Sequence, residues 1–225
     1  MGEVLCFDVY GSTHNQYSEP ILDALERELG VATPVADEIA RQWIHRELRY
    51  TFEVTLMDAY DTALNLTAAA LSETLGYYGL DADVGTVAAI MDAYEHIEPY
   101  ESWEPLERLQ AAGHDLYILS NGDPEMLETL AANTGMDEHL DGIVSAQEVR
   151  AYKPSPEVYT NMQTHVDRDI EECRMVATHL FDLAGAANAG MRTAFVDRHN
   201  VPARRIDFEP DIAVPTYERL TDELA

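Results

Sequence analysis

VLCFDVYGST, residues 4–13, is a short apolar run that ends abruptly in a carboxylate, Asp8. Residues 3–7 are typical of a buried strand, and Tyr10 and Ser12 follow Asp8 closely. In open α/β sheets, ligands bind beyond the carboxyl ends of the strands. If residues 3–7 belong to such a sheet, Asp8 lies where a ligand can reach it.

Strands and helices alternate after residue 99, which predicts a parallel, doubly wound α/β sheet that includes the strand at 3–7. The predicted strands cover residues 3–7, 116–119, 142–146, 173–178, 192–197 and 212–214. The predicted helices in this part cover residues 103–112, 124–135 and 182–190, and another begins within 153–166.

Residues 21–94 show apolar residues at helical spacing and no strand pattern. The predicted helices cover residues 21–29, 35 to the fifties, 59–75 and 84–94. The sequence therefore predicts an α/β core, formed by residues 1–13 and 96–225, with an all-helical domain inserted at residues 14–95.

The composition is strongly acidic, with 42 Asp and Glu against 14 Lys and Arg and a formal net charge of −28. The acids are spread along the chain, which is typical of a solvating coat in a high-salt, halophilic cytoplasm. No basic patch favours a nucleic-acid partner. No apolar run is long enough for a membrane span, and no export leader is visible. The two cysteines, Cys6 and Cys173, give no disulfide framework.

Polar side chains follow four of the predicted segments, at the edge of the sheet where ligands bind. These candidate residues are Asp8, Tyr10, Ser12, Ser120, Asn121, Lys153, Thr178, His179 and Asp182. Lys153 is the single lysine of the chain. A carboxylate, a lysine and a second carboxylate at converging loops indicate covalent catalysis. The ammonium would keep Asp8 ionised, and Asp182 would orient or deprotonate a water. The structural alternative for each carboxylate is a helix cap.

Four motifs, in this order and spacing, resemble the haloacid dehalogenase superfamily over the whole chain. They are the stretch at 4–13, SNG at 120–122, KPSPEVY at 153–159, and the FD within VATHLFDLAGAANAG at 176–190. The resemblance implies a helical cap domain after the first strand. Phosphatases of this superfamily carry an acid at the position of Tyr10, and 2-haloacid dehalogenases carry tyrosine. Thr178 replaces an acid that helps to hold Mg²⁺ in the phosphatases, so no metal or cofactor is expected.

The resemblance implies a two-step mechanism. Asp8 attacks C2 of a short 2-haloalkanoate and displaces the halide, and water then hydrolyses the ester on Asp8. Asp182 would position this water with Lys153 and His179. The resemblance further assigns Ser120 to the substrate carboxylate, Asn121 to the halide, Tyr10 to the pocket wall, and Tyr159 to the support of Lys153. Ser12 and Phe181 stand where the family usually has Thr and Trp.

Several positions that bind the halide or line the pocket in the family carry other residues here. The family has an arginine for the halide directly after the cap tryptophan, but Ile44 follows Trp43 here. The nearby candidates for that role are Arg41, Arg46 and Arg49. His179 replaces an asparagine, and Ala63 replaces an aromatic residue that closes the family's pocket.

Two other functions remain open at this point. One is a Mg²⁺-dependent phosphatase acting on small phosphate esters. The other is a binding or interaction protein that keeps the fold with a degraded dehalogenase site. A small-molecule haloacid is the expected partner of the enzyme, and the resemblance suggests a homodimer.

Overall fold

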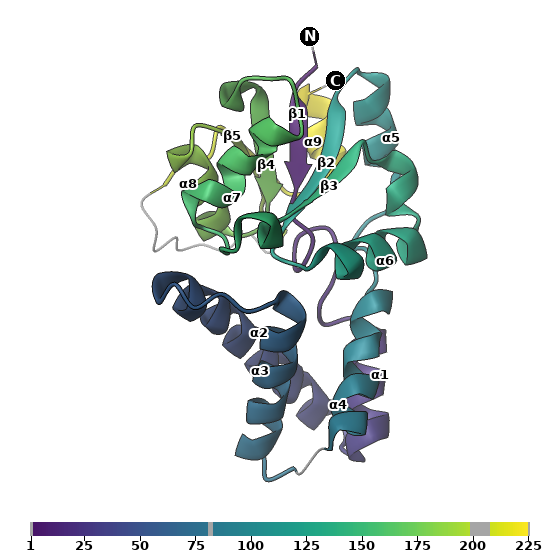
Figure 1. Cartoon of the computed structure of the whole chain (residues 1–225). Coiled ribbons are helices and arrows are strands. Elements are labelled where there is room, and N and C mark those ends of the chain that lie inside the picture. Colours follow the sequence, from purple (N-terminus) through teal and green to yellow (C-terminus); the bar gives the residue numbers. More distant parts are fainter. Residues whose placement is uncertain (1, 81–82, 199–207, 225) are drawn as a thin grey trace.

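The computed structural model describes residues 2–80, 83–198 and 208–224, and its centre is a six-stranded parallel sheet (Figure 1). The strands stand in the order β3-β2-β1-β4-β5-β6, so β1 lies in the middle. Their bounds are Val4–Phe7 (β1), Asp115–Ser120 (β2), Gly142–Ser145 (β3), Cys173–Ala177 (β4), Arg192–Val196 (β5) and Ile212–Val214 (β6). Every predicted strand is present, and the predicted doubly wound sheet is confirmed.

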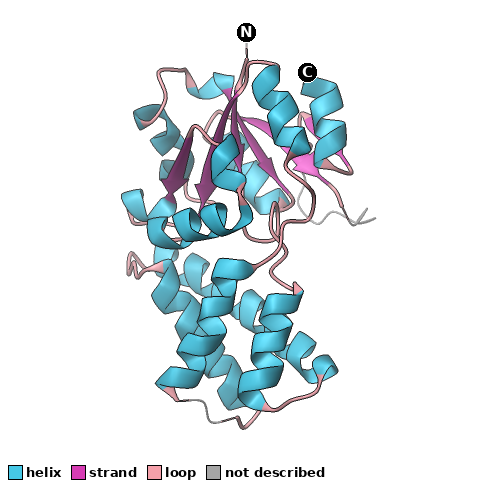
Figure 2. Ribbon diagram, turned by 90° about the vertical axis from the view of Figure 1, so that its right-hand side faces the viewer, coloured by secondary structure: helices cyan, strands magenta, loops and turns pink. Residues whose placement is uncertain are grey.

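Successive side chains of β1 point to opposite faces of the sheet and all are buried, so each face must be covered by helices. Leu5 and Phe7 pack into one apolar cluster, with residues of α5, α6 and α9. Val4 and Cys6 pack into the other, with residues of α7 and α8. Figure 2 shows helices on both faces of the sheet. These helices are Glu104–Ala111 (α5), Pro124–Thr134 (α6), Pro156–Thr160 (α7), Leu180–Asn188 (α8) and Tyr217–Leu224 (α9).

A helical unit, the cap, lies beyond the arrowheads of the strands in Figure 1. Its helices are Glu19–Leu29 (α1), Thr33–Leu56 (α2), Ala63–Tyr77 (α3) and Val84–Met91 (α4). The helices α2 and α3 pack side by side, and the Trp43 indole of α2 donates a 2.8 Å hydrogen bond to the Thr67 carbonyl of α3. Because the cap lies beyond the strand ends, it covers the carboxyl edge of the sheet, where Asp8 lies.

Three predicted helices show the largest differences from the observed ones, and the ends of the others lie within one or two residues of the prediction. The helix predicted at 59–75 begins only at Ala63, because Thr62 caps it by accepting a hydrogen bond from the Asn65 amide at 3.3 Å. The helix predicted at 84–94 changes to a 3₁₀-helix after Met91. The helix within 153–166 is α7, which follows the prolines and continues as a 3₁₀-helix.

The 3₁₀-helices of the described chain are all short. They cover Asp92–His96, Met136–His139, Ala146–Val149, Asn161–Thr164 and Ile170–Glu172. Across the described ranges, no helix combines the length and apolar character that a bilayer span needs. The domain division at 14 and 95 stays a prediction.

Close packing of α8 depends on Gly185. A Cβ at this position would lie 2.7 Å from both Pro154 Cβ and Tyr159 Oη. We expect Gly185→Ala to lower the free energy of unfolding by about 1–3 kcal/mol, because the extra methyl forces neighbouring groups apart. Denaturant unfolding measures this, with Asn188→Ala at the exposed end of α8 as control. Equal stability of the two variants would contradict the packing argument.

Candidate functional site

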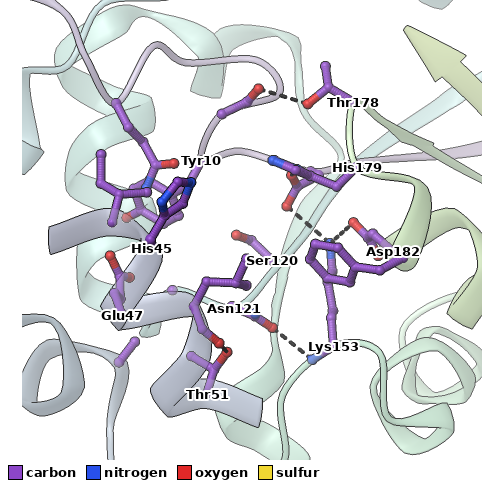
Figure 3. Close-up of a pocket in the computed structure, with 18 of the residues that line it drawn as sticks. Tyr10, His45, Glu47, Thr51, Ser120, Asn121, Lys153, Thr178, His179 and Asp182 are labelled. Atoms are coloured by element: carbon purple, nitrogen blue, oxygen red, sulfur yellow. Dashed lines mark hydrogen bonds and ion pairs between the residues drawn. The ribbon is translucent and has the colours of Figure 1, made fainter. Parts of the chain in front are cut away.

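A cavity of about 350 Å³ lies between the carboxyl edge of the sheet and the cap (Figure 3). The core contributes the residues predicted from the strand ends, and the cap contributes one face of α2. The core residues that line it include Asp8, Tyr10, Ser120, Asn121, Lys153, Thr178, His179, Phe181 and Asp182. The structure therefore brings these predicted residues together around one space.

Asp8 follows β1 at the start of a tight turn. The amides of Ser12, Thr13 and His14 all donate hydrogen bonds to the Val9 carbonyl, at 3.0–3.1 Å. This turn brings the Ser12 hydroxyl back to Asp8, where it donates a 2.6 Å hydrogen bond to Oδ2. Because the turn is held by backbone bonds, the Asp8 carboxylate has a fixed position.

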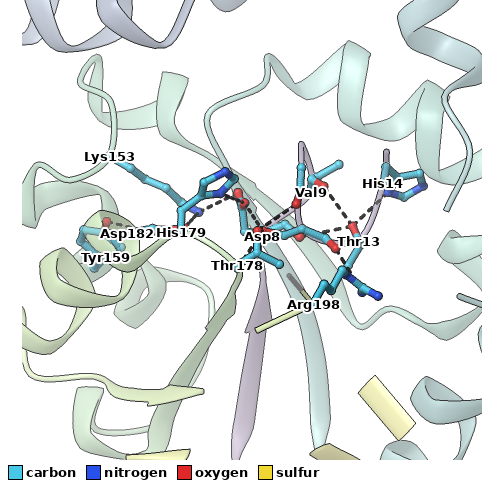
Figure 4. A network of polar contacts seen from close by, with 12 residues as sticks. Asp8, Val9, Thr13, His14, Lys153, Tyr159, Thr178, His179, Asp182 and Arg198 are labelled. Carbon is cyan, nitrogen blue, oxygen red and sulfur yellow. Dashed lines mark hydrogen bonds and ion pairs between the residues drawn. The ribbon is translucent and has the colours of Figure 1, made fainter. Parts of the chain in front are cut away.

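Lys153 lies between two buried carboxylates (Figure 4). Its Nζ donates to Asp8 Oδ1 at 3.1 Å and to Asp182 Oδ2 at 2.8 Å. The Tyr159 hydroxyl donates to the other oxygen of Asp182, also at 2.8 Å. The side chain of Lys153 is only 2 % exposed, so the two ion pairs are shielded from water.

The two carboxylates differ in acidity. Burial alone would raise the pKa of Asp8, but the ammonium of Lys153, the nearby imidazole of His179 and the hydrogen bond from Ser12 hold it well below its usual range. Burial raises the pKa of Asp182, against the pull of Lys153, and the charge of Asp8 adds to this rise. Two carboxyls whose pKa values are separated in this way can take different roles in a reaction. Asp8 stays ionised at neutral pH, and Asp182 is the more basic of the two.

The loop after β4 is tied to the loop after β1. The Thr178 amide donates to Ser12 Oγ at 3.1 Å, and its hydroxyl donates to the Gly11 carbonyl at 2.8 Å. His179 Nδ1 lies 3.6 Å from Asp8 Oδ2. Gly11 has a φ of 79°, and a Cβ there would lie 3.0 Å from the His179 ring, so glycine is required at this approach.

Ser120 and Asn121 end β2 and present polar groups to the cavity. The Ser120 hydroxyl is buried and has no hydrogen-bond partner in the described part of the chain, which leaves it for a bound ligand. The Lys153 backbone amide donates to Asn121 Oδ1 at 2.9 Å. Because an amide N–H only donates, this bond fixes the orientation of Asn121 and leaves its NH₂ group as the free donor.

Ser12 and Tyr159, also predicted as site residues, lie behind the cavity and do not line it. Ser12 bonds to Asp8, and Tyr159 bonds to Asp182. Within the described residues, no group of three or more His, Cys, Asp or Glu side chains is arranged to hold a metal ion.

The cap side of the cavity is formed mainly by one face of α2. Its lining residues recur at the spacing of a helix face and comprise Ile44, Glu47, Leu48 and Thr51, with His45 beside them. Sequence analysis missed His45, Glu47, Leu48 and Thr51 as lining residues, although counting in helical steps from Ile44 would have found three of them. Gln16, Tyr17, Ala63, Tyr100 and Met126 also line the cavity.

None of the three candidate arginines reaches the cavity. Each makes an ion pair elsewhere: Arg41 with Asp37, Arg46 with Glu73, and Arg49 with Glu53. Among the described residues that line the cavity, none is an arginine. No arginine of α2 therefore takes the role of the family arginine that is missing at position 44.

Comparison with known proteins agrees with this geometry. The family model of haloacid dehalogenase-like hydrolases matches residues 3–190. The chain is 32% identical over 197 residues to (S)-2-haloacid dehalogenase 4A of Burkholderia cepacia, covering 87% of this chain and 83% of that protein. It is 29% identical over 221 residues to an (S)-2-haloacid dehalogenase of Pseudomonas putida, covering 98% and 95%.

A solved structure shows the same fold with a covalent ligand. The L-2-haloacid dehalogenase of Xanthobacter autotrophicus with chloropropionic acid covalently bound superimposes with a TM-score of 0.89. It is 28% identical, and the match covers 99% of this chain and 98% of that one.

Removal of the shared ammonium tests the electrostatics of the site. We expect Lys153→Met to lower the free energy of unfolding at pH 7 by about 3–5 kcal/mol, because two buried carboxylates lose their counter-charge. Without Lys153, burial raises both folded-state pKa values above the unfolded ones. The loss should therefore shrink as the pH falls and the carboxyls become protonated.

Denaturant unfolding from pH 7 to pH 5 measures this difference between variant and parent. The control is Arg27→Met, which removes one positive charge from an exposed position. A loss that is independent of pH, or no larger than that of the control, would contradict the shared ion pair.

Proposed function

Since this chain belongs to the haloacid dehalogenase-like hydrolases, we propose that it hydrolyses short 2-haloalkanoates to 2-hydroxyacids. The reaction runs through an ester on Asp8. The observation that carries this proposal is the single ammonium of Lys153 between two carboxylates of different basicity, at 3.1 and 2.8 Å. One carboxylate is poised as a nucleophile, and the other is poised as a base.

In the first step, an ionised Asp8 oxygen attacks C2 of the substrate, and the halide leaves with the electron pair of the carbon–halogen bond. The low pKa of Asp8 keeps it ionised at neutral pH. The buried Ser120 hydroxyl, which has no hydrogen-bond partner among the described residues, would donate to the substrate carboxylate. The Asn121 NH₂ group, left free by the bond at its oxygen, would face the departing halide.

In the second step, water attacks the carbonyl carbon of the Asp8 ester and releases the 2-hydroxyacid. Asp182 accepts the proton of this water, which its raised pKa favours. Lys153 contacts both carboxylates and stabilises the charge that develops on Asp8. Tyr159 orients Asp182 from behind, and His179 and Phe181 form the wall beside the ester.

Tyr10 supports dehalogenation over phosphate-ester hydrolysis. A halide leaves without a proton, whereas an alkoxide leaving group needs a general acid. Tyr10 lines the cavity, but burial raises the pKa of its hydroxyl far above neutrality, which makes it a poor acid. We further propose that no metal is needed, because Lys153 already provides the positive charge between Asp8 and Asp182.

The setting of the enzyme is also part of this proposal. The net charge of −28 supports a cytoplasm of high salt, where ions screen the repulsion between acids. A homodimer is proposed on the family resemblance.

The reaction is tested by measuring the chloride that (S)-2-chloropropionate releases in molar KBr, with chloride separated from bromide. Hydrolysis of p-nitrophenyl phosphate with Mg²⁺ is the phosphatase comparison. We expect halide release without Mg²⁺, and Asp8→Asn should reduce it by several orders of magnitude. Asp167→Asn, an exposed position, is the matched control. In a single turnover in ¹⁸O water, the label should enter Asp8 and not the product.

Failure of either result would count against the proposal. Undiminished release by the Asp8→Asn variant, or label found first in the 2-hydroxyacid, would exclude the ester. Phosphate release in place of halide release would favour the phosphatase.

Salt should stabilise the fold. The screening length falls from about 10 Å at 0.1 M to about 3 Å at 1 M salt, so repulsion between the acids weakens and Tm should rise with KCl. Near pH 5, closer to the isoelectric point of about 4.3, the same salt step should raise Tm less. A Tm that is unchanged or lowered by KCl at pH 7 would refute the halophilic setting.

A further inference from the structure

Glu47 lines the same cavity as Asp8, yet neither step of the proposed reaction uses it. It lies on the cavity face of α2, one turn beyond Ile44, the position where the family has an arginine. In Figure 3 its carboxyl group lies on the cap side, across the cavity from Lys153 and Asp182. Glu47 therefore stands opposite the groups that carry out the proposed reaction.

The Glu47 carboxyl accepts a hydrogen bond and, among the residues that the structure describes, forms no ion pair. The Tyr94 hydroxyl donates to Oε2 at 3.2 Å. None of the described arginine, lysine or histidine side chains forms an ion pair with it. Burial raises its pKa to about 7, although the hydrogen bond from Tyr94 opposes this rise. The carboxyl is therefore present in both protonation states near neutral pH.

The cavity has room for more than a short haloacid. Its volume of about 350 Å³ corresponds to roughly ten water molecules, whereas chloropropionate is only a few times the size of one. Ala63 adds space on the cap side. Gln16, His45 and Glu47 place polar groups among the apolar side chains of this part of the lining, so the extra space can also take a polar extension of the substrate.

We propose that Glu47 is a specificity-determining residue that hydrogen-bonds a hydroxyl group carried beyond C2 by the preferred 2-haloacid. This inference rests on the proposed dehalogenation and adds no covalent step. A hydroxyl group suits the site better than an ammonium group, because it donates to the carboxylate and accepts from the protonated acid. An ammonium group only donates and is held only by the ionised form.

Two substrates of the same shape test this. (S)-2-Chloro-3-hydroxypropanoate and (S)-2-chlorobutanoate differ only by a hydroxyl in place of a methyl group. A hydrogen bond to a charged group contributes about 1.5–3 kcal/mol, so we expect kcat/KM for the hydroxylated substrate to be about tenfold higher or more. Glu47→Leu should remove this preference, and Glu47→Gln should reduce it.

The readout is the ratio of the two kcat/KM values in each variant, corrected for chloride release without enzyme. Glu53→Gln is the control, because it neutralises an exposed glutamate of the same helix that pairs with Arg49 away from the cavity. A parent ratio near one, or a ratio unchanged by Glu47→Leu, overturns the inference.

Failure of the dehalogenation itself is distinguishable. If neither substrate releases chloride, the proposed reaction is wrong, and the ratio is then taken from dissociation constants. Calorimetric titration of Asp8→Asn and of Asp8→Asn with Glu47→Leu gives these constants without turnover. Tighter binding of the hydroxylated acid only where Glu47 is present supports the inference, and equal binding overturns it.

Discussion

One buried ammonium determines how the site is built. Lys153 bonds to Asp8 and Asp182 at once, and its side chain is almost fully shielded from water. Two carboxylates at this depth would otherwise repel each other and lose their hydration. Because a single cation serves both, the segment that carries Lys153 must meet the ends of β1 and β4 at one point. The parallel sheet provides this meeting point, since its strand ends lie along one edge.

The neighbouring contacts make this arrangement rigid. Ser12 joins the turn after β1 to the loop after β4 through Thr178, and Tyr159 fixes the far oxygen of Asp182. Gly185 lets Tyr159 approach α8 closely. The core thus holds the carboxylates and Lys153 in place, while α2 of the cap supplies most of the opposite wall of the cavity. The ion-paired groups and the wall that faces them come from different elements.

The sequence predicted the core better than the cap side of the site. Asp8, Lys153 and Asp182 follow or precede regular elements whose order predicts a shared sheet edge, and the structure brings them together. Glu47 was missed because one helix face of α2 serves both packing and the cavity, so apolar spacing alone does not identify it, and helical steps were not counted from Ile44. The start of α3 was misplaced because a tertiary contact adds to the Thr62 cap: Asp123, the N-cap residue of α6, accepts hydrogen bonds from the amides of Ala63 and Leu64.

The burial of Lys153 also affects how the protein can be handled chemically. The chain offers no other side-chain amine, because its remaining basic residues are arginine and histidine. Reagents that couple to lysine therefore find no exposed lysine side chain on the folded molecule, and surface attachment through lysine is ineffective. Unfolding exposes this one amine, so its labelling reports opening of the site directly.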